Sequence, residues 1–325
     1  GAIPRVNVSI KISSLTPICD PLKGEAAISD LMSRLEPILH AAKAKGVFVN
    51  FDMEQYSLKD FTLDLFMRCC EKYDFDAGLA MQAYLKSGDA DARRICEWSK
   101  RTGRIVSVRL VKGAYWDYET IHAEEMGWPC PVWNTKRETD ACFERMTAIF
   151  LDACPRRGGE GGVKLALGSH NVRSVATALA GLESRGLPKE SIELQMLHGM
   201  ADQLKAAASE MGYRVREYVP VGEMIPGMAY LVRRLLENTS NESWLRAGFL
   251  DNASTDVLLR SPHVSASTSP AQVNGVSVNG HAQTDVIPGG SKPDLYLIAP
   301  ERHTLTPAVP HVGDNRPFFT EPMRD

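Results

Sequence analysis

Two cations, a glycine and two aromatic residues stand together in the segment RLVKGAYWD, which begins at Arg109. An apolar, β-branched run precedes it and predicts a buried strand, so these side chains emerge where the strand ends. Parallel α/β folds keep their chemistry at that end. Gly113 would let the backbone approach a ligand closely, Tyr115 and Trp116 offer flat faces, and Lys112 adds fixed charge. The segment therefore predicts a ligand site.

Polar and aromatic side chains also follow the other predicted strands: Lys11, Asp52, Gln82, His170, Asn171, His198 and Tyr218. A predicted helix over residues 228–238 brings four more onto one broad face: Tyr230, Arg233, Arg234 and Glu237. Adjacent arginines can grip a small carboxylate, and an aromatic ring can cover it. These residues offer no zinc-site spacing, Ser-His-Asp order or paired catalytic carboxylates. They suit a large planar anionic cofactor better than hydrolysis.

Strands and helices must alternate to position these residues. Seven strands are predicted near residues 6, 47, 77, 105, 163, 192 and 213, and each is followed by a helix. After the strand near residue 105, a longer loop from 118 to 136 is expected before the helix. Such alternation predicts parallel strands with right-handed crossovers. We expect an α/β fold, a (β/α)8 TIM-type barrel whose first βα unit is missing from this chain; an open seven-stranded sheet is the alternative. The glycine-rich segment 156–162 follows a helix and precedes a strand, which predicts a connector rather than a phosphate loop.

Composition limits the remaining possibilities. The chain has 325 residues, 44% of them hydrophobic, and a net charge of -3, which gives no general attraction to nucleic acid. No apolar run approaches the length of a membrane span or signal peptide, so we expect an intracellular protein with reduced cysteines. Residues 1–262 should form the barrel. Residues 263–325, rich in Ser, Pro, Gly and Asn, should be a linker or extension.

Four strings in this order resemble the proline dehydrogenase domain of the bifunctional proline utilization A family. They are VSIK from Val8, RLVKGAYWD from Arg109, LHGM from Leu197 and YLVRRLLEN from Tyr230. The resemblance implies a distorted barrel that binds FAD and oxidises L-proline to 1-pyrroline-5-carboxylate, the first step of proline catabolism to glutamate. A hydride would pass from the proline ring carbon beside nitrogen to flavin N5, and electrons would then reach a membrane quinone.

The same resemblance implies roles for individual residues. Arg233 and Arg234 would clamp the proline carboxylate, assisted by Lys11. Tyr218 and Tyr230 would enclose the ring, Asp52 would order Lys11 or its neighbours, and Glu237 would fix an arginine. Arg109 would lie near flavin N5 and Gln82 at the edge of the flavin ring. The rest of the cofactor would be held by Lys112, Gly113, Ala114, Tyr115, Trp116, Lys136, Thr139, His170 and Asn171.

The resemblance further implies partners and a location. The tail would lead toward an aldehyde dehydrogenase domain of the same polypeptide, absent from this chain. The location would be cytoplasmic, with peripheral attachment to the inner membrane as the alternative. Two other functions stay open: a Schiff-base aldolase that uses Lys11 or Lys112 as nucleophile, and an inactive structural fragment of a larger enzyme.

Overall fold

The computed structural model describes residues 6–16, 19–223, 225, 228, 232 and 255–263. Its strands are β1 (Asn7–Ile10), β2 (Phe48–Phe51), β3 (Ala77–Gln82), β4 (Ile105–Val111), β5 (Gly162–Gly168), β6 (Ile192–Leu197) and β7 (Arg214–Tyr218). Its α-helices are α1 (Glu25–Ala44), α2 (Lys59–Lys72), α3 (Gly88–Thr102), α4 (Trp116–Met126), α5 (Lys136–Asp152), α6 (Val172–Ser184), α7 (Asp202–Glu210) and α10 (Thr255–Leu258). Short 3-10 helices are η1 (Ile12–Ser14), η2 (Pro21–Lys23), η3 (Tyr56–Leu58) and η4 (Lys189–Ser191).

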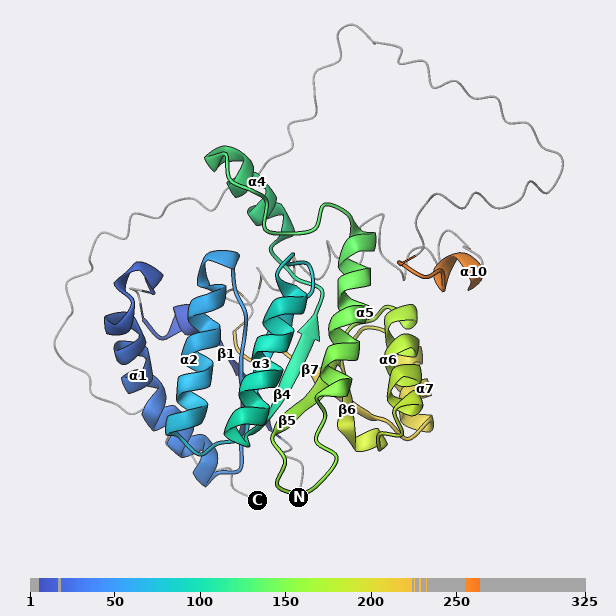
Figure 1. The fold of residues 1–325 in the computed structure, drawn as a ribbon, viewed down its shortest axis with the longest axis horizontal. Coiled ribbons are helices and arrows are strands. Elements are labelled where there is room, and N and C mark those ends of the chain that lie inside the picture. The colour runs from blue at the N-terminus through green and yellow to red at the C-terminus, as the bar shows by residue number, and fades with distance from the viewer. Residues whose placement is uncertain are drawn as a thin grey trace, which may run out of the picture. The chain divides into compact units, whose positions relative to one another are not determined.

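The seven strands form one sheet in the order β1-β2-β3-β4-β5-β6-β7, and every neighbouring pair is parallel. The sheet is curled into a half-barrel, with helices α1, α2, α3 and α5 along its outer side (Figure 1). The predicted strand-helix alternation is thereby confirmed, and the curl identifies the barrel rather than a flat open sheet.

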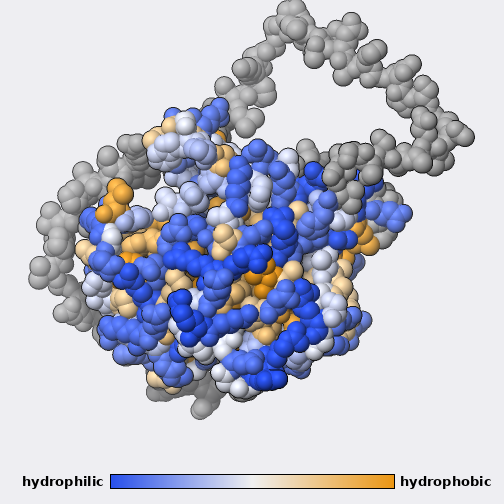
Figure 2. All heavy atoms as spheres, viewed as in Figure 1, coloured by the Kyte–Doolittle hydropathy of each residue, from blue (hydrophilic) through white to orange (hydrophobic). Residues whose placement is uncertain are grey.

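Apolar periodicity explains how the helices pack on the sheet. In α1 the buried residues Ile28, Leu31, Leu35 and Leu39 recur at helical spacing and share one face. The Thr135 side chain and Glu138 form a capping box that begins α5, and Gly103, in the left-handed conformation, ends α3. The surface over these helices is largely hydrophilic, with small hydrophobic patches between them (Figure 2).

The concave side of the sheet is unusually polar. In β6 the residues Ile192, Leu194 and Met196 are buried in the main hydrophobic core. Glu193 and Gln195 alternate with them, so they point to the opposite side. The same alternation in the other strands brings polar side chains together inside the curled sheet. The predicted residues Arg109, Asp52 and Tyr218 lie in this interior rather than in the helix layer.

One predicted loop is wrong. Most of α4, an 11-residue helix in which only Glu119 and Ala123 are buried, lies within the expected excursion over 118–136. With so little of the helix buried, its sequence carries no apolar stripe, and this absence explains the error. The sequence does contain a residue typical of a helix C-terminus, because Gly127 ends α4 in the left-handed conformation.

Several other predictions can be compared with the structure. The strand predicted near residue 77 ends at Gln82, after which Ala83 and Tyr84 follow β4 through backbone hydrogen bonds. The glycine-rich segment is a turn in which Glu160 accepts from the backbone of Arg156 and Arg157. In the part of the chain that the structure describes, no helix is long and apolar enough to cross a membrane.

Candidate functional site

Arg109 lies at the centre of the polar interior. Its Nε donates to Gln195 Oε1 in β6 at 2.8 Å, its Nη1 to Asp52 Oδ1 after β2 at 2.8 Å, and its Nη2 to Ser9 Oγ in β1 at 2.7 Å. The Tyr218 ring at the end of β7 lies 5.6 Å from the guanidinium carbon. One buried cation therefore contacts groups from four other strands.

Such a cluster requires the curl of the sheet. In a flat sheet, β1 and β7 would each lie about 14 Å from β4, beyond the reach of one arginine side chain. Small neighbours also give Arg109 room, because its register partners in β3 and β5 are Ala80 and Ala166, both buried. The long side chain can pass over these two methyl groups to reach the next strands.

Gln82 and Asp52 lie beside this cluster at the ends of β3 and β2. Gln82 is 5% exposed, and its Nε2 donates to the Glu54 carbonyl at 3.2 Å. Its Oε1 is buried and has no hydrogen-bond partner among the residues that the structure describes. The Asp52 carboxylate accepts from both Arg109 and Asn50. The resemblance led us to expect Asp52 to order Lys11 or neighbouring side chains, and in the structure its ion-pair partner is Arg109.

Lys112 and Lys136 share one carboxylate, that of Asp140 in α5. Lys112 Nζ forms an ion pair with Asp140 Oδ1, and Lys136 Nζ lies 2.8 Å from Oδ2. Burial alone would raise the pKa of Asp140, but the two ammonium groups outweigh burial and hold that pKa below its ordinary value. The arrangement gathers two cations beside the end of β4. It also engages the Lys112 amine, which a Schiff-base mechanism would need to be free.

Gly113 has a structural reason for being glycine. Its φ is +132°, and a Cβ at this position would lie 2.5 Å from Cδ1 and 2.6 Å from Cδ2 of the Tyr84 ring. Tyr115 packs against the same small cluster of Tyr84, Leu85 and Val132. The backbone therefore crosses the face of a buried ring, a close approach made within the protein itself.

The remaining predicted residues lie around the same end of the sheet or at helix starts. Trp116 begins α4, is 43% exposed and donates from Nε1 to the Trp133 carbonyl at 2.8 Å. Leu197 N donates to His170 Nε2 at 3.0 Å, and Asn171 caps α6 by accepting from Ser174 N at 3.2 Å. Lys11 and Ala114 are exposed, whereas Thr139 is buried in the first turn of α5. His198 pairs with Glu217 at 2.6 Å, on the exposed side of β7.

Four predicted residues lie outside the described residues: Tyr230, Arg233, Arg234 and Glu237. The helix expected over 228–238, apart from residues 228 and 232, and the segment after residue 263 lie outside them as well. The clamp that the resemblance implies for a substrate carboxylate therefore stays a prediction.

Sequence reasoning missed the residues that hold the predicted cations. Gln195 and Ser9 hold Arg109, and Asp140 holds two lysines. A signal existed for Gln195, because a polar residue at an alternate position of an otherwise apolar strand points into the barrel. Within the described residues no cluster of His, Cys, Asp and Glu could hold a metal ion.

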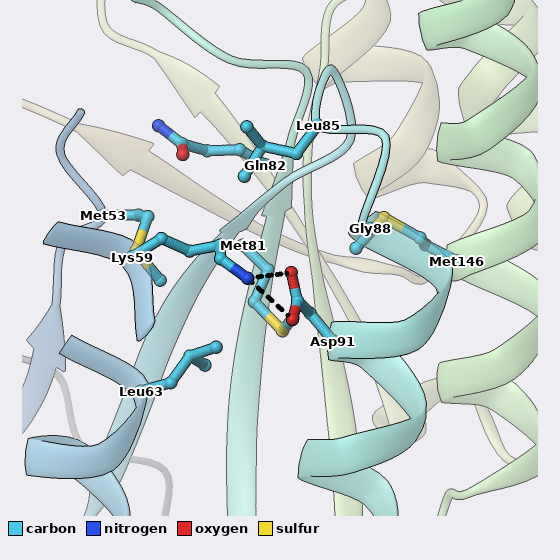
Figure 3. A pocket seen from close by; sticks show the side chains of 9 residues that line it. All are labelled: Met53, Lys59, Leu63, Met81, Gln82, Leu85, Gly88, Asp91 and Met146. Carbon is cyan, nitrogen blue, oxygen red and sulfur yellow. Dashed lines mark hydrogen bonds and ion pairs between the residues drawn. The ribbon is translucent and has the colours of Figure 1, made fainter. Parts of the chain in front are cut away.

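A small cavity of about 10 Å³ lies on the other side of β3, between α2 and α3. Lys59 and Asp91 form a buried ion pair there, at 2.9 and 3.0 Å (Figure 3). The Gln82 amide is turned away from this pair (Figure 3). The cavity is too small for more than a water molecule, so the candidate site is the polar interior around Arg109.

Comparisons with known proteins agree with this geometry. The model of the family "Proline dehydrogenase" matches residues 1–247. The bifunctional protein PutA of Klebsiella aerogenes is 30% identical over 290 residues, which are 85% of this chain and 21% of that protein. Proline dehydrogenase 1 of Bacillus subtilis is 27% identical over 219 residues, 67% of this chain and 64% of that protein.

Solved structures show the same likeness. Proline utilization A from Bdellovibrio bacteriovorus, inactivated by N-propargylglycine, is 47% identical with a TM-score of 0.76 over 81% of this chain and 27% of that one. A mutant of the Bradyrhizobium japonicum protein is 31% identical with a TM-score of 0.70 over 79% of this chain and 26% of that one. The chain thus spans about a fifth to a quarter of these bifunctional relatives. On the extent of the family match, the chain belongs to the proline dehydrogenase family.

Proposed function

We propose that this chain is an FAD-dependent proline dehydrogenase that oxidises L-proline to 1-pyrroline-5-carboxylate and passes the electrons to a membrane quinone. The family match and the names of the relatives support the substrate. The observation that carries the proposal is the buried Arg109 guanidinium, held at the strands' carboxyl ends by Asp52, Ser9 and Gln195. The proposed location is cytoplasmic, with contact at the inner membrane where the quinone is.

One buried polar atom among these residues fits a bound flavin. Gln82 Oε1, at the end of β3 beside the Arg109 cluster, is a buried acceptor to which no group of the described part of the chain donates. A buried amide oxygen without a donor costs about 1–3 kcal/mol, so an N–H group of a bound ring would remove that cost. The isoalloxazine edge carries such an N–H group. When bound, FAD would supply the two-electron hydride acceptor that no side chain provides.

The chain's own residues would bind and orient the flavin and proline. Arg109 keeps one N–H on each terminal nitrogen that has no partner among the described residues, and its charge favours negative charge in front of it. Lys112 and Lys136 would face the phosphates. We propose that Lys11, Arg233 and Arg234 surround proline. These cations favour the neutral amine over the ammonium form, and the neutral amine is the form that can lose hydride.

The visible spectrum of the purified chain tests the proposal directly. The chain is mixed with FAD, freed of unbound cofactor and recorded anaerobically before and after L-proline is added. Bound flavin bands that bleach with L-proline, but not with D-proline, are expected. N-propargylglycine, named as the inactivator of the Bdellovibrio relative, should also modify the spectrum. Bound flavin that L-proline leaves oxidised would refute the substrate, and failure to retain any FAD would refute the cofactor.

A matched pair of variants tests the clamp. Arg234→Ala should raise the KM for proline far more than it changes flavin content, since the residue is proposed to bind the substrate carboxylate. Arg137→Ala, on the exposed start of α5, serves as the control. An unchanged KM in Arg234→Ala would rule out its role in the clamp.

A further inference from the structure

A continuous row of polar contacts crosses the barrel interior from β7 to β4. Arg216 Nε lies 2.7 Å from Glu193 Oε1, and Arg216 Nη2 lies 3.0 Å from Glu193 Oε2. Gln195 Nε2 donates to Glu193 Oε1 at 2.8 Å, and Gln195 Oε1 accepts from Arg109 Nε at 2.8 Å. The row therefore ends at the cation on which the proposed chemistry depends.

The Gln195 amide is fixed at both ends. A carboxylate can only accept and a guanidinium can only donate, so the amide nitrogen must face Glu193 and the amide oxygen must face Arg109. Gln195 is 9% exposed and Glu193 has a side-chain exposure of 12%, so water competes little for these bonds. A single amide orientation satisfies both neighbours, and it presents a rigid acceptor to Arg109.

The contact at Nε determines how the rest of Arg109 points. The guanidinium is planar, so anchoring Nε together with one hydrogen bond from each terminal nitrogen fixes the plane as well as its position. Two of these three acceptors are neutral, Gln195 and Ser9. Only Asp52 offsets the positive charge. A neutral acceptor at Nε orients the cation without reducing its field.

We infer that Gln195 is a positioning residue, whose amide holds the Arg109 guanidinium with its two remaining terminal N–H groups directed at the bound reactants. The inference rests on the proposed function. Glu193 and Arg216 act through Gln195, because they fix the orientation of its amide. A role limited to filling the interior would instead affect folding stability alone, without changing the charge or orientation of Arg109 in the folded protein.

The first measurement needs no flavin. In the full chain labelled with ¹⁵N-arginine, the exchange rate of the Arg109 Nε hydrogen is measured by NMR, with Arg109→Lys identifying its resonance. Gln195→Met keeps the shape of the side chain but lacks the acceptor. Exchange should be at least about tenfold faster in this variant, since one charge-assisted hydrogen bond is lost. Gln203→Met, on the exposed side of α7, is the matched control.

The second measurement uses the flavin-loaded chain. Gln195→Met should reduce flavin with proline about tenfold more slowly at saturating proline, with KM changed less than kcat. The exchanged pair Glu193→Gln with Gln195→Glu keeps an acceptor oxygen facing Arg109 and an amide beside it, so it should preserve the slow Nε exchange. It moves a negative charge closer to Arg109, which should lower the flavin midpoint potential below that of the wild type.

The outcomes separate the two proposals. If folded Gln195→Met keeps wild-type exchange and wild-type flavin reduction, the positioning role is refuted. If Gln195→Met does not fold, fast Nε exchange in the folded Glu193→Gln, Gln195→Glu pair refutes it instead. If the wild type is not reduced by proline, the proposed function fails, whereas the exchange rates measured without flavin still decide whether Gln195 holds Arg109.

Discussion

Replacement of Gly113 by alanine tests how the end of β4 is built. The added methyl group would lie 2.5 Å from Cδ1 of Tyr84, on a backbone whose φ of +132° disfavours any L side chain. The unusual backbone conformation costs about 1–3 kcal/mol, and forcing a carbon into a filled space costs about 1–3 kcal/mol more. We therefore expect Gly113→Ala to lower the free energy of unfolding by about 2–6 kcal/mol.

A control separates the two contributions. Gly103, which ends α3, also has a positive φ of +71°, but nothing lies within 4 Å of its would-be Cβ. Gly103→Ala should therefore show the backbone cost alone, about 1–2 kcal/mol. Both variants are compared with the wild type by urea unfolding followed by far-ultraviolet circular dichroism, at equal protein concentration.

A double-mutant cycle with Tyr84→Ala completes the test. Removing the ring gives the added methyl group space, so Gly113→Ala should cost about 1–3 kcal/mol less in the Tyr84→Ala background. If Gly113→Ala is no more destabilising than Gly103→Ala, or if the cycle shows no coupling, the close approach of the backbone to Tyr84 does not explain the glycine. Flavin content measured in parallel shows whether the same loop affects cofactor binding.

Three further predictions concern charges and thiols. Asp91→Asn removes the buried partner of the Lys59 ammonium and leaves it paired with the exposed Asp60 carboxylate, so it should destabilise by about 3–5 kcal/mol in urea unfolding. Asp60→Asn, whose side chain is 70% exposed, should cost under about 1 kcal/mol. Asp140 has a lowered pKa in the folded state, so its stabilising effect is complete at neutral pH and is lost as the pH falls below about 4. The difference in free energy of unfolding between wild type and Asp140→Asn should therefore shrink from pH 7 to pH 3. A constant difference would contradict the pairing with the two lysines. Burial raises the pKa of Cys142 to about 11 and of Cys69 to about 12, so a thiol reagent at pH 8 should label first the two half-buried cysteines, Cys19 and Cys130.

The arrangement of strands and helices could largely be predicted from the sequence. Apolar runs with β-branched residues and helical stripes are local signals, and they located all seven strands and the amphipathic helices. They failed for α4, because that helix buries only Glu119 and Ala123. Glu119 accepts from Tyr56 N at 2.6 Å across 63 positions of the chain, a contact that no local pattern can indicate.

The contacts within the site were less predictable. The rule that strands deliver side chains at their carboxyl ends pointed to Arg109, Asp52 and Gln82. Which of them pair depends on how tightly the sheet curls, and the curl results from packing over the whole sheet. For the same reason the glycine in RLVKGAYWD was interpreted as making room for a ligand, when the structure shows the Tyr84 ring against it.

The distribution of Arg109's partners along the chain has a consequence for how the protein is made. Ser9, Asp52 and Gln195 lie 100, 57 and 86 positions from Arg109. Contacts of such long sequence separation form late and slowly, and synthesis on the ribosome delivers Gln195 and Tyr218 well after Arg109. Until β6 and β7 have been added, the guanidinium lacks the acceptor at its Nε, Gln195, and the Tyr218 ring. The charged interior is therefore among the last parts to be completed, and occupancy of this interior by a ligand would report that the whole sheet has assembled.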